Sequence, residues 1–188
     1  KEDKSLAWIL GDPTGWVGVD QSYFFTPEGE DFEWFYAQHN VSILDNGDIA
    51  LFDNGTAKVK RVDGDNRVSG DNVYSRAVVY QIDTENMTVS QVTEYGKERG
   101  ADWYSDWISG VVSLDGTQDH LWITAGSHLH SDEENRSDYY PKDMFVQGLT
   151  KTTHIDQVDN GELSFELTIS GDTYNALTYR SFRMPLYT

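Results

Sequence analysis

The sequence predicts an all-β protein built from short antiparallel strands. Turn-forming pairs, among them Asn46-Gly47, Asp115-Gly116 and Asn160-Gly161, separate apolar runs along the chain. Asn-Gly or Asp-Gly between apolar runs is the strongest short-range hairpin signal. The runs themselves are rich in β-branched and aromatic residues, several alternate apolar with polar, and none forms a helical stripe. These patterns are typical of strands, and we expect about ten to twelve of them.

The expected strands are short and follow one another in pairs. They cover residues 41–44, 49–52, 77–82, 87–95, 109–114, 120–124, 163–169 and 177–184. Alternation predicts that they are half-buried antiparallel strands. Residues 94–102 leave room for a short turn at most, residues 131–138 are acidic enough for an inserted or surface loop, and residues 1–4 are expected to fray.

A sandwich, a barrel and a propeller all accommodate strands of this kind. The unit of two apolar runs around a turn recurs at Gly47, Gly116 and Gly161. Their separations are about 70 and 45 residues, and propeller blades repeat every 40 to 50 or so. The spacing therefore favours β-propeller blades, with insertions between some of them.

Composition excludes several classes of function. The formal net charge of −18 argues against binding of nucleic acids or anionic membrane surfaces, which need clustered Lys and Arg. No run approaches the roughly 18 apolar residues of a membrane span. The chain has no Cys, which excludes disulfides, thiol catalysis and zinc–thiolate sites. It begins at Lys1, so we expect a processed or excised chain from which any export signal is already gone.

Two short patterns contain metal-ligating residue types. His128-x-His130 puts two imidazoles on one face of an expected strand, and Asp63-x-Asp65-Asn66 resembles the start of a calcium loop. Neither pattern is completed by a further ligand at suitable spacing. We therefore expect neither a metal site nor another cofactor.

Five strings in fixed order carry a family resemblance. They are residues 9–16, 38–55, 74–83, 94–100 and 103–105. Their order and spacing together resemble the C-terminal part of the bacterial arylsulfate sulfotransferases that work without a nucleotide sulfate donor. The resemblance is close over residues 6–114 and diffuse beyond them, apart from residues 179–186.

The resemblance implies a six-bladed β-propeller with its active site in the central channel. Residues 1–188 would then form a C-terminal segment of about three blades. The family transfers a sulfuryl group from an aryl sulfate to a phenol through a sulfated histidine that follows Gln, which corresponds to His39 here. Further implications are an exported, periplasmic location, a second chain that carries the N-terminal blades, and a possible homodimer. Without those blades we expect this chain to be inactive.

Histidine suits this chemistry. A neutral imidazole nitrogen is a good nucleophile near neutral pH, and its second nitrogen should donate to an oxygen that fixes the tautomer. Donors must also face the sulfuryl oxygens. For substrate binding we name Asn54, Arg76, Ser109 and Tyr104. The resemblance implies a Thr a few residues after the string at 103–105. Ile108 has no donor there, and Ser109 substitutes for the Thr if the register shifts by one residue. An aromatic surround is expected from Trp34, Phe35, Tyr36, Trp103, Tyr104 and Trp107.

Several residues also have ordinary structural interpretations. A single His in an aromatic strand is usually a packed residue, Asn54 can simply stabilise a turn, and Arg76 can form a structural salt bridge. Two other functions remain open. One is an aryl sulfate hydrolase, in which water takes the sulfuryl group from His39. The other is a non-catalytic propeller module that binds aromatic or carbohydrate ligands.

Overall fold

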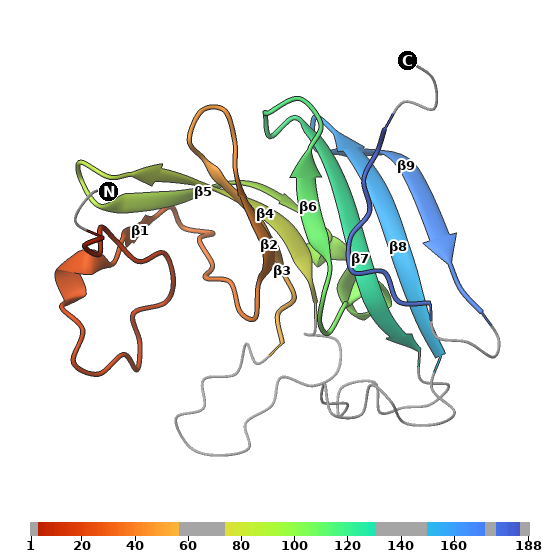
Figure 1. Cartoon of the computed structure of the whole chain (residues 1–188), viewed down its shortest axis with the longest axis horizontal. Helices are drawn as coiled ribbons and strands as arrows, with labels where there is room; N and C mark the ends of the chain where they lie inside the picture. Colours follow the sequence, from red (N-terminus) through yellow and green to blue (C-terminus); the bar gives the residue numbers. More distant parts are fainter. Residues whose placement is uncertain (1–3, 57–73, 131–149, 172–175, 185–188) are drawn as a thin grey trace.

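A computed structural model describes residues 4–56, 74–130, 150–171 and 176–184 of the chain. In these residues the fold is all-β, with two open sheets and short 3-10 turns (Figure 1). The first sheet has the order β1-β5-β4-β3-β2. Its strands are β1 (Thr26–Glu28), β2 (His39–Ile43), β3 (Ile49–Asp53), β4 (Arg76–Asp83) and β5 (Thr88–Tyr95). The strands β2 to β5 form an antiparallel meander, and β1 pairs with β5 in parallel.

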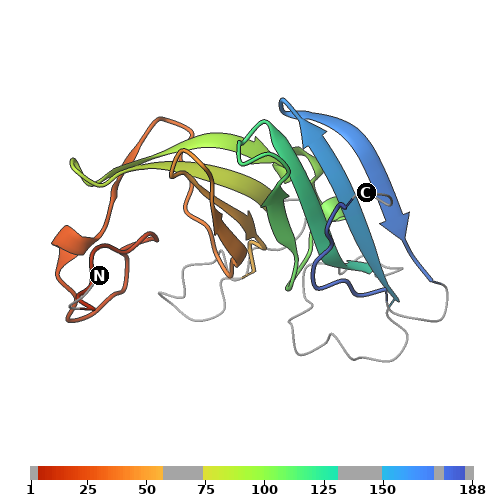
Figure 2. The same ribbon diagram turned by 45° about the horizontal axis from the view of Figure 1, so that its top comes forward.

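The second sheet is another antiparallel meander, in the order β6-β7-β8-β9. Its strands are β6 (Gly110–Ser113), β7 (His120–His130), β8 (Thr150–Asp159) and β9 (Glu162–Ile169). The N-terminal segment and β9 lie at opposite ends of the molecule in both views (Figures 1 and 2). Strands β2 and β3 contact β6, so the first strands of the two meanders are neighbours.

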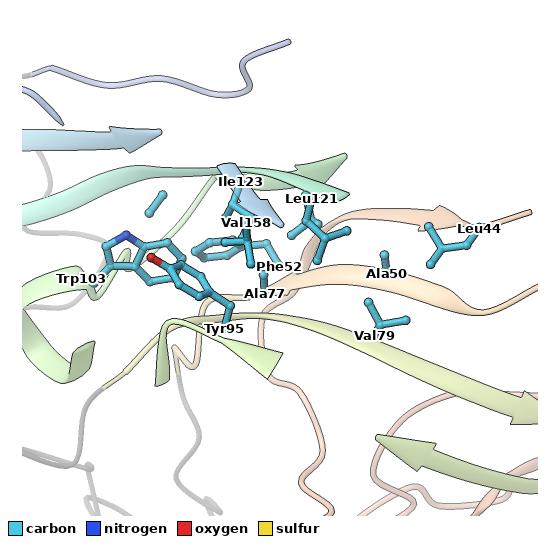
Figure 3. Packing of buried hydrophobic residues seen from close by; sticks show 12 residues of the cluster. Leu44, Ala50, Phe52, Ala77, Val79, Tyr95, Trp103, Leu121, Ile123 and Val158 are labelled. Carbon is cyan, nitrogen blue, oxygen red and sulfur yellow. The ribbon is translucent and has the colours of Figure 1, made fainter. Parts of the chain in front are cut away.

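The main hydrophobic core lies between the two sheets (Figure 3). Alternate residues of β3 and β4, such as Phe52 and Val79, point into it, while their neighbours Leu51 and Val78 join a second cluster on the other face. Both strands are therefore buried on both faces and carry near-continuous apolar runs. The expectation of half-buried strands is wrong for these two.

Trp103 anchors the segment that joins the two sheets. The 3-10 turn η3 (Lys97–Trp103) follows β5 and places this fully buried indole against Phe52 and Tyr95. Gly96 precedes the turn with φ +102°, and a Cβ atom there would lie 2.2 Å from the Trp103 ring. Only glycine tolerates both the backbone conformation and this close approach.

Most of the expected strands are confirmed, within a few residues at their ends. The strand expected at residues 177–184 is wrong. These residues contain no strand and instead run along β7, with Thr178 N–H donating to Gly126 O at 3.0 Å. Strand β8 was not predicted from the sequence, and β7 extends well beyond residue 124. Residues 131–138 lie outside the described residues. The propeller arrangement and the number of blades stay predictions.

Asp156 on β8 is a buried carboxyl beside the main core. Tyr95 Oη donates to its Oδ2 at 3.2 Å and Arg99 Nη1 at 2.8 Å. Burial raises the pKa of Asp156 to about 6, in spite of the opposing charge of Arg99. The folded state therefore holds this proton more tightly than an ordinary aspartate with a pKa of 3.8.

The unfolding free energy should consequently depend on pH through the titration of Asp156. Its stabilising effect is fully present below the unfolded-state pKa and is lost as the pH rises through the folded-state value, a change of up to about 3 kcal/mol. Asp156→Asn removes the titration. We expect the unfolding free energy of the variant, relative to wild type, to rise by that amount between about pH 4 and pH 7. Urea titrations across this range measure it, and a pH-independent difference contradicts the assignment.

Candidate functional site

His39 opens β2 at an irregular point of the sheet. It lies opposite Phe52 of β3, and the register shifts between His39 and Ser42. The next residue, Asn40, has a φ of +53°, and its side-chain nitrogen donates to Val111 O of β6 at 2.6 Å. A Cβ atom on Gly110 would lie 3.1 Å from the Asn40 side chain, which is a tight contact. The half-buried His39 is thus held where the first strands of the two meanders meet.

Asn54 is brought directly to His39. It occupies the turn after β3, is fully buried, and its Oδ1 lies 2.7 Å from His39 Nδ1. Its side-chain nitrogen donates to two backbone oxygens, Ser105 O at 2.7 Å and Ile108 O at 2.9 Å. Two of the residues singled out from the sequence therefore form one connected unit.

The two carbonyls belong to a loop between η3 and β6 that is itself held in place by hydroxyl groups. Ser75 Oγ bridges Asn54 O and the backbone of Ser105, with distances of 2.9 to 3.1 Å. Ser105 Oγ and Ser109 Oγ are 2.8 Å apart, and they accept from the backbone N–H groups of Ser127 and Gly126 respectively.

Ser109 lies in this loop, buried, with its hydroxyl engaged by protein partners. Ile108 and Ser109 have φ values of +51° and +93°. Positive φ at a β-branched residue is strained and persists only where surrounding contacts hold it. The hydrogen bonds therefore maintain a strained loop against Asn54, and the role of Ser109 as a substrate ligand stays a prediction.

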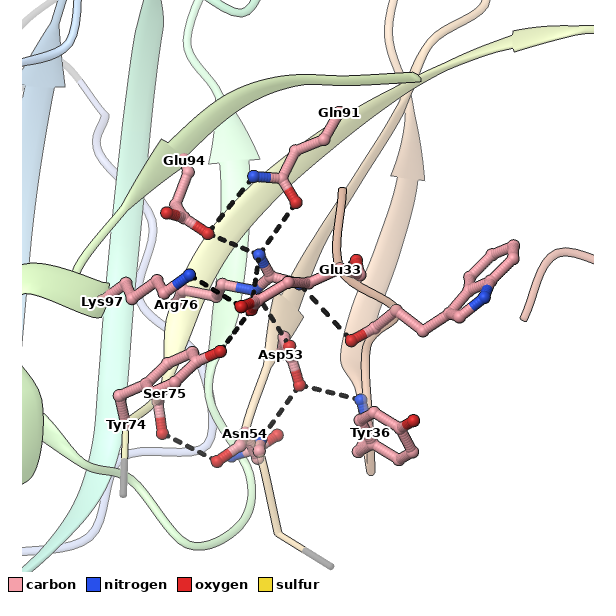
Figure 4. Close-up of polar contacts among 12 residues, drawn as sticks. Glu33, Tyr36, Asp53, Asn54, Tyr74, Ser75, Arg76, Gln91, Glu94 and Lys97 are labelled. Carbon is pink, nitrogen blue, oxygen red and sulfur yellow. Dashed lines mark hydrogen bonds and ion pairs between the residues drawn. The ribbon is translucent and has the colours of Figure 1, made fainter. Parts of the chain in front are cut away.

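Arg76 is buried at the start of β4, directly across from Asp53 of β3. Its Nε donates to Asp53 Oδ2 at 3.0 Å, and both side chains are 0% exposed (Figure 4). Asp53 Oδ1 accepts from the backbone N–H groups of Tyr36, at 2.8 Å, and Gly55, at 2.9 Å.

The rest of the guanidinium is also surrounded by acceptors. Nη1 pairs with Glu94 and donates to Gln91 Oε1 at 2.9 Å, while Nη2 donates to Glu33 O at 3.0 Å and Tyr80 Oη at 3.1 Å. Of the two roles considered for Arg76, this geometry favours the structural ion pair over a cation that contacts substrate.

Tyr104 and the other aromatic residues are distributed more widely than the sequence suggests. Tyr104 Oη lies 3.4 Å from Thr56 Oγ1, and burial raises the pKa of Tyr104 to about 12, so the phenol stays protonated at neutral pH. Trp103 belongs to the main core, whereas Trp34 and Phe35 pack in the second cluster on the other face of the first sheet. These three do not form one wall around His39.

The comparison with known families settles the relationship of the chain. The model of the arylsulfotransferase family (ASST) matches residues 1–180. The chain belongs to the arylsulfotransferase family. It is 31% identical to the arylsulfate sulfotransferase AssT of Escherichia coli O6:H1 over 95% of its length, and 31% identical to the protein of the same name from Lelliottia amnigena over 77%. It spans 30% and 27% of those two relatives.

Three contributors to the site of this arylsulfotransferase chain were missed by sequence reasoning. Asp53, Ser75 and Ser105 are buried polar residues that support Asn54 or its loop. Ser75 and Ser105 do lie within the strings that carry the family resemblance, which was the available signal. Asp53 resembled an ordinary turn residue, because an Asx side chain before glycine is common in turns.

Two sequence patterns contain metal-ligating residue types, at residues 63–66 and 128–130. Among the described residues, no group of three or more His, Asp or Glu side chains could hold a metal ion. His128 Nδ1 lies 2.9 Å from Tyr104 O, and the pattern at residues 63–66 is outside the described residues. In the same part of the chain, no helix is long and apolar enough to cross a membrane.

Proposed function

We propose that this chain supplies the nucleophile of an arylsulfate sulfotransferase, with His39 carrying the sulfuryl group between an aryl sulfate donor and a phenolic acceptor. The observation that carries the proposal is the contact of 2.7 Å between His39 Nδ1 and the buried Asn54, which occupies one ring nitrogen and leaves the other for chemistry. Family membership and the name of the two relatives support the same reaction.

The reaction proceeds by two displacements at sulfur. First, the lone pair of a neutral His39 nitrogen attacks sulfur, and the bond from sulfur to the donor oxygen breaks to release a phenolate. Then the oxygen of the acceptor phenol attacks sulfur, and the N–S bond breaks to restore the imidazole. The acceptor loses a proton to solvent and the released phenolate gains one, so charge and protons balance. Such transfer resembles phosphoryl transfer, with charge spread over the peripheral oxygens.

The architecture supports a wider proposal about the whole protein. Two four-stranded meanders lie side by side with β2 and β6 adjacent, as expected for the inner strands of neighbouring propeller blades. His39 begins one of these strands. In this proposal the remaining blades complete a central channel around His39, lie in the rest of a longer protein or on a second chain, and contribute further sulfate ligands. An exported, periplasmic location and a homodimer belong to the same proposal.

The test uses the intact protein with p-nitrophenyl sulfate, with and without an added phenol. We expect nitrophenol release that depends on the phenol. We also expect an acid-labile adduct with the mass of one SO₃ on the peptide that contains His39, visible by mass spectrometry when the acceptor is omitted. Release that ignores the phenol would instead indicate a hydrolase. Binding of p-nitrophenyl sulfate without any release would indicate a non-catalytic module, and either result overturns the proposal.

A further inference from the structure

The orientation of the Asn54 amide follows from its partners. The oxygens of Ser105 and Ile108 are backbone carbonyls, which only accept hydrogen bonds, and both lie within 2.9 Å of one end of the amide. That end must therefore be the NH₂ group, whose two hydrogens satisfy the two carbonyls. The opposite end, which faces His39 Nδ1, must be the carbonyl oxygen, an acceptor only.

This orientation determines where the proton of His39 resides. An acceptor at 2.7 Å from Nδ1 requires a hydrogen on Nδ1. In the neutral ring the lone pair is then on Nε2. We infer that Asn54 is a positioning residue: it fixes the Nδ1–H tautomer of His39 and thereby makes Nε2 the atom that attacks sulfur. This inference rests on the proposed function, and it assigns Asn54 a role through His39 rather than a contact with substrate.

The same contact should strengthen as the reaction proceeds. When Nε2 bonds to sulfur, the ring becomes a cation that retains its Nδ1–H. A hydrogen bond from a charged donor is roughly twice as strong as a neutral one. The Asn54 oxygen therefore stabilises the transition state and the sulfated ring more than the resting imidazole, which is the condition for catalysis.

Rigidity of the amide makes this contact specific. Asn54 is 0% exposed, and rotating its amide would place the side-chain oxygen against two carbonyl oxygens. Its loop partners are in turn connected to β4 through Ser75 and to β7 through Ser127. The fold therefore orients the acceptor before substrate binds, so no reorganisation is needed during the reaction.

The first test is read on the wild-type protein and needs no turnover. Nitrogen-15 NMR of the intact protein, with the His39 signals assigned through His39→Gln, reports which ring nitrogen carries the proton when the ring is neutral. We expect the proton on Nδ1. A proton on Nε2 overturns the inference whether or not the protein transfers sulfuryl groups, so the result is separate from that of the proposed function.

The second test compares two substitutions that lose the same two donor bonds to the loop. Asn54→Leu also loses the acceptor, whereas Asn54→Asp keeps an oxygen that can accept from Nδ1–H. We expect kcat to fall about 10- to 100-fold in Asn54→Leu, as for loss of one hydrogen bond to a charged group, with KM little changed. Asn54→Asp should retain more kcat than Asn54→Leu at equal or lower thermal stability, with the SO₃ group still on Nε2.

A purely structural role for Asn54 predicts no advantage in kcat for Asn54→Asp over Asn54→Leu. In that case activity would follow stability, and Asn54→Asp, which buries a carboxylate beside two carbonyl oxygens, would be no better than Asn54→Leu. Such a ranking overturns the inference, as does an Nδ1 proton that persists in Asn54→Leu. Asn46→Ala is the matched control, because this exposed asparagine contacts Asp48 at the other end of the same hairpin. If neither Asn54 variant folds, the NMR result on the wild-type protein decides.

Discussion

His39→Ala should abolish phenol-dependent release of nitrophenol by the intact protein. Removing the nucleophile of a two-step transfer leaves no group to form the intermediate, and comparable losses in other enzymes are on the order of 10⁴- to 10⁶-fold in kcat. The adduct with the mass of one SO₃ should disappear with the activity. Release is followed through the coloured product of p-nitrophenyl sulfate, and the adduct by mass spectrometry of the peptide that contains residue 39.

The control for this prediction is another histidine on a strand. His120 begins β7, its side chain is 42% exposed, and its Nδ1 lies 2.9 Å from Asp159 Oδ1, so His120→Ala should leave transfer unchanged. Loss of the contact between His39 and Asn54 is expected to destabilise the fold by about 1 kcal/mol, which thermal denaturation can verify. Transfer that survives in a folded His39→Ala protein would show that another residue is the nucleophile.

Arg76→Met should have the largest effect on stability. The guanidinium and the carboxylate of Asp53 are both 0% exposed, at 3.0 Å from each other. Methionine fills a similar volume but leaves the buried carboxylate without this cation, and breaking a buried ion pair from one side typically costs about 3 to 5 kcal/mol. Urea denaturation followed by tryptophan fluorescence measures the loss of unfolding free energy.

A double substitution separates the charge from the packing. Asp53→Asn combined with Arg76→Met removes both charges, so we expect it to be less destabilised than Arg76→Met alone. Arg180→Met, at an exposed arginine stacked on Tyr179, should stay within about 0.5 kcal/mol of wild type. An Arg76→Met protein as stable as this control would mean that the ion pair contributes nothing.

Arg76→Met should also affect the candidate site around His39. Asp53 accepts from the Gly55 N–H and so shapes the turn that presents Asn54. A weakened turn would loosen the contact between Asn54 and His39 without touching either side chain. Reduced kcat in a folded Arg76→Met protein is therefore compatible with a purely supporting role for this arginine.

Local pattern predicted the strands well where turns are short. The hairpin of β2 and β3 follows from Asn46-Gly47 between two apolar runs, because turn chemistry and side-chain period act within a few residues. Local pattern does not predict β8, and it predicts a strand at residues 177–184, where the structure has none. Their segment makes isolated hydrogen bonds to Gly126 and Thr124 of β7 but forms no strand pairing.

The sequence by itself determined the all-β class and the positions of most hairpins, since these depend on local period and turn residues. It also led to the prediction that His39 is the nucleophile, which follows from the order of the motifs. Only the tertiary structure decided that Asn54 faces His39 while Arg76 turns away to Asp53. The physical reason is register. Asp53 and Arg76 are cross-strand partners in β3 and β4, and Asn54 meets a loop more than 50 residues further along the chain. Local sequence does not encode such long-range pairing, because it arises only when the sheets assemble.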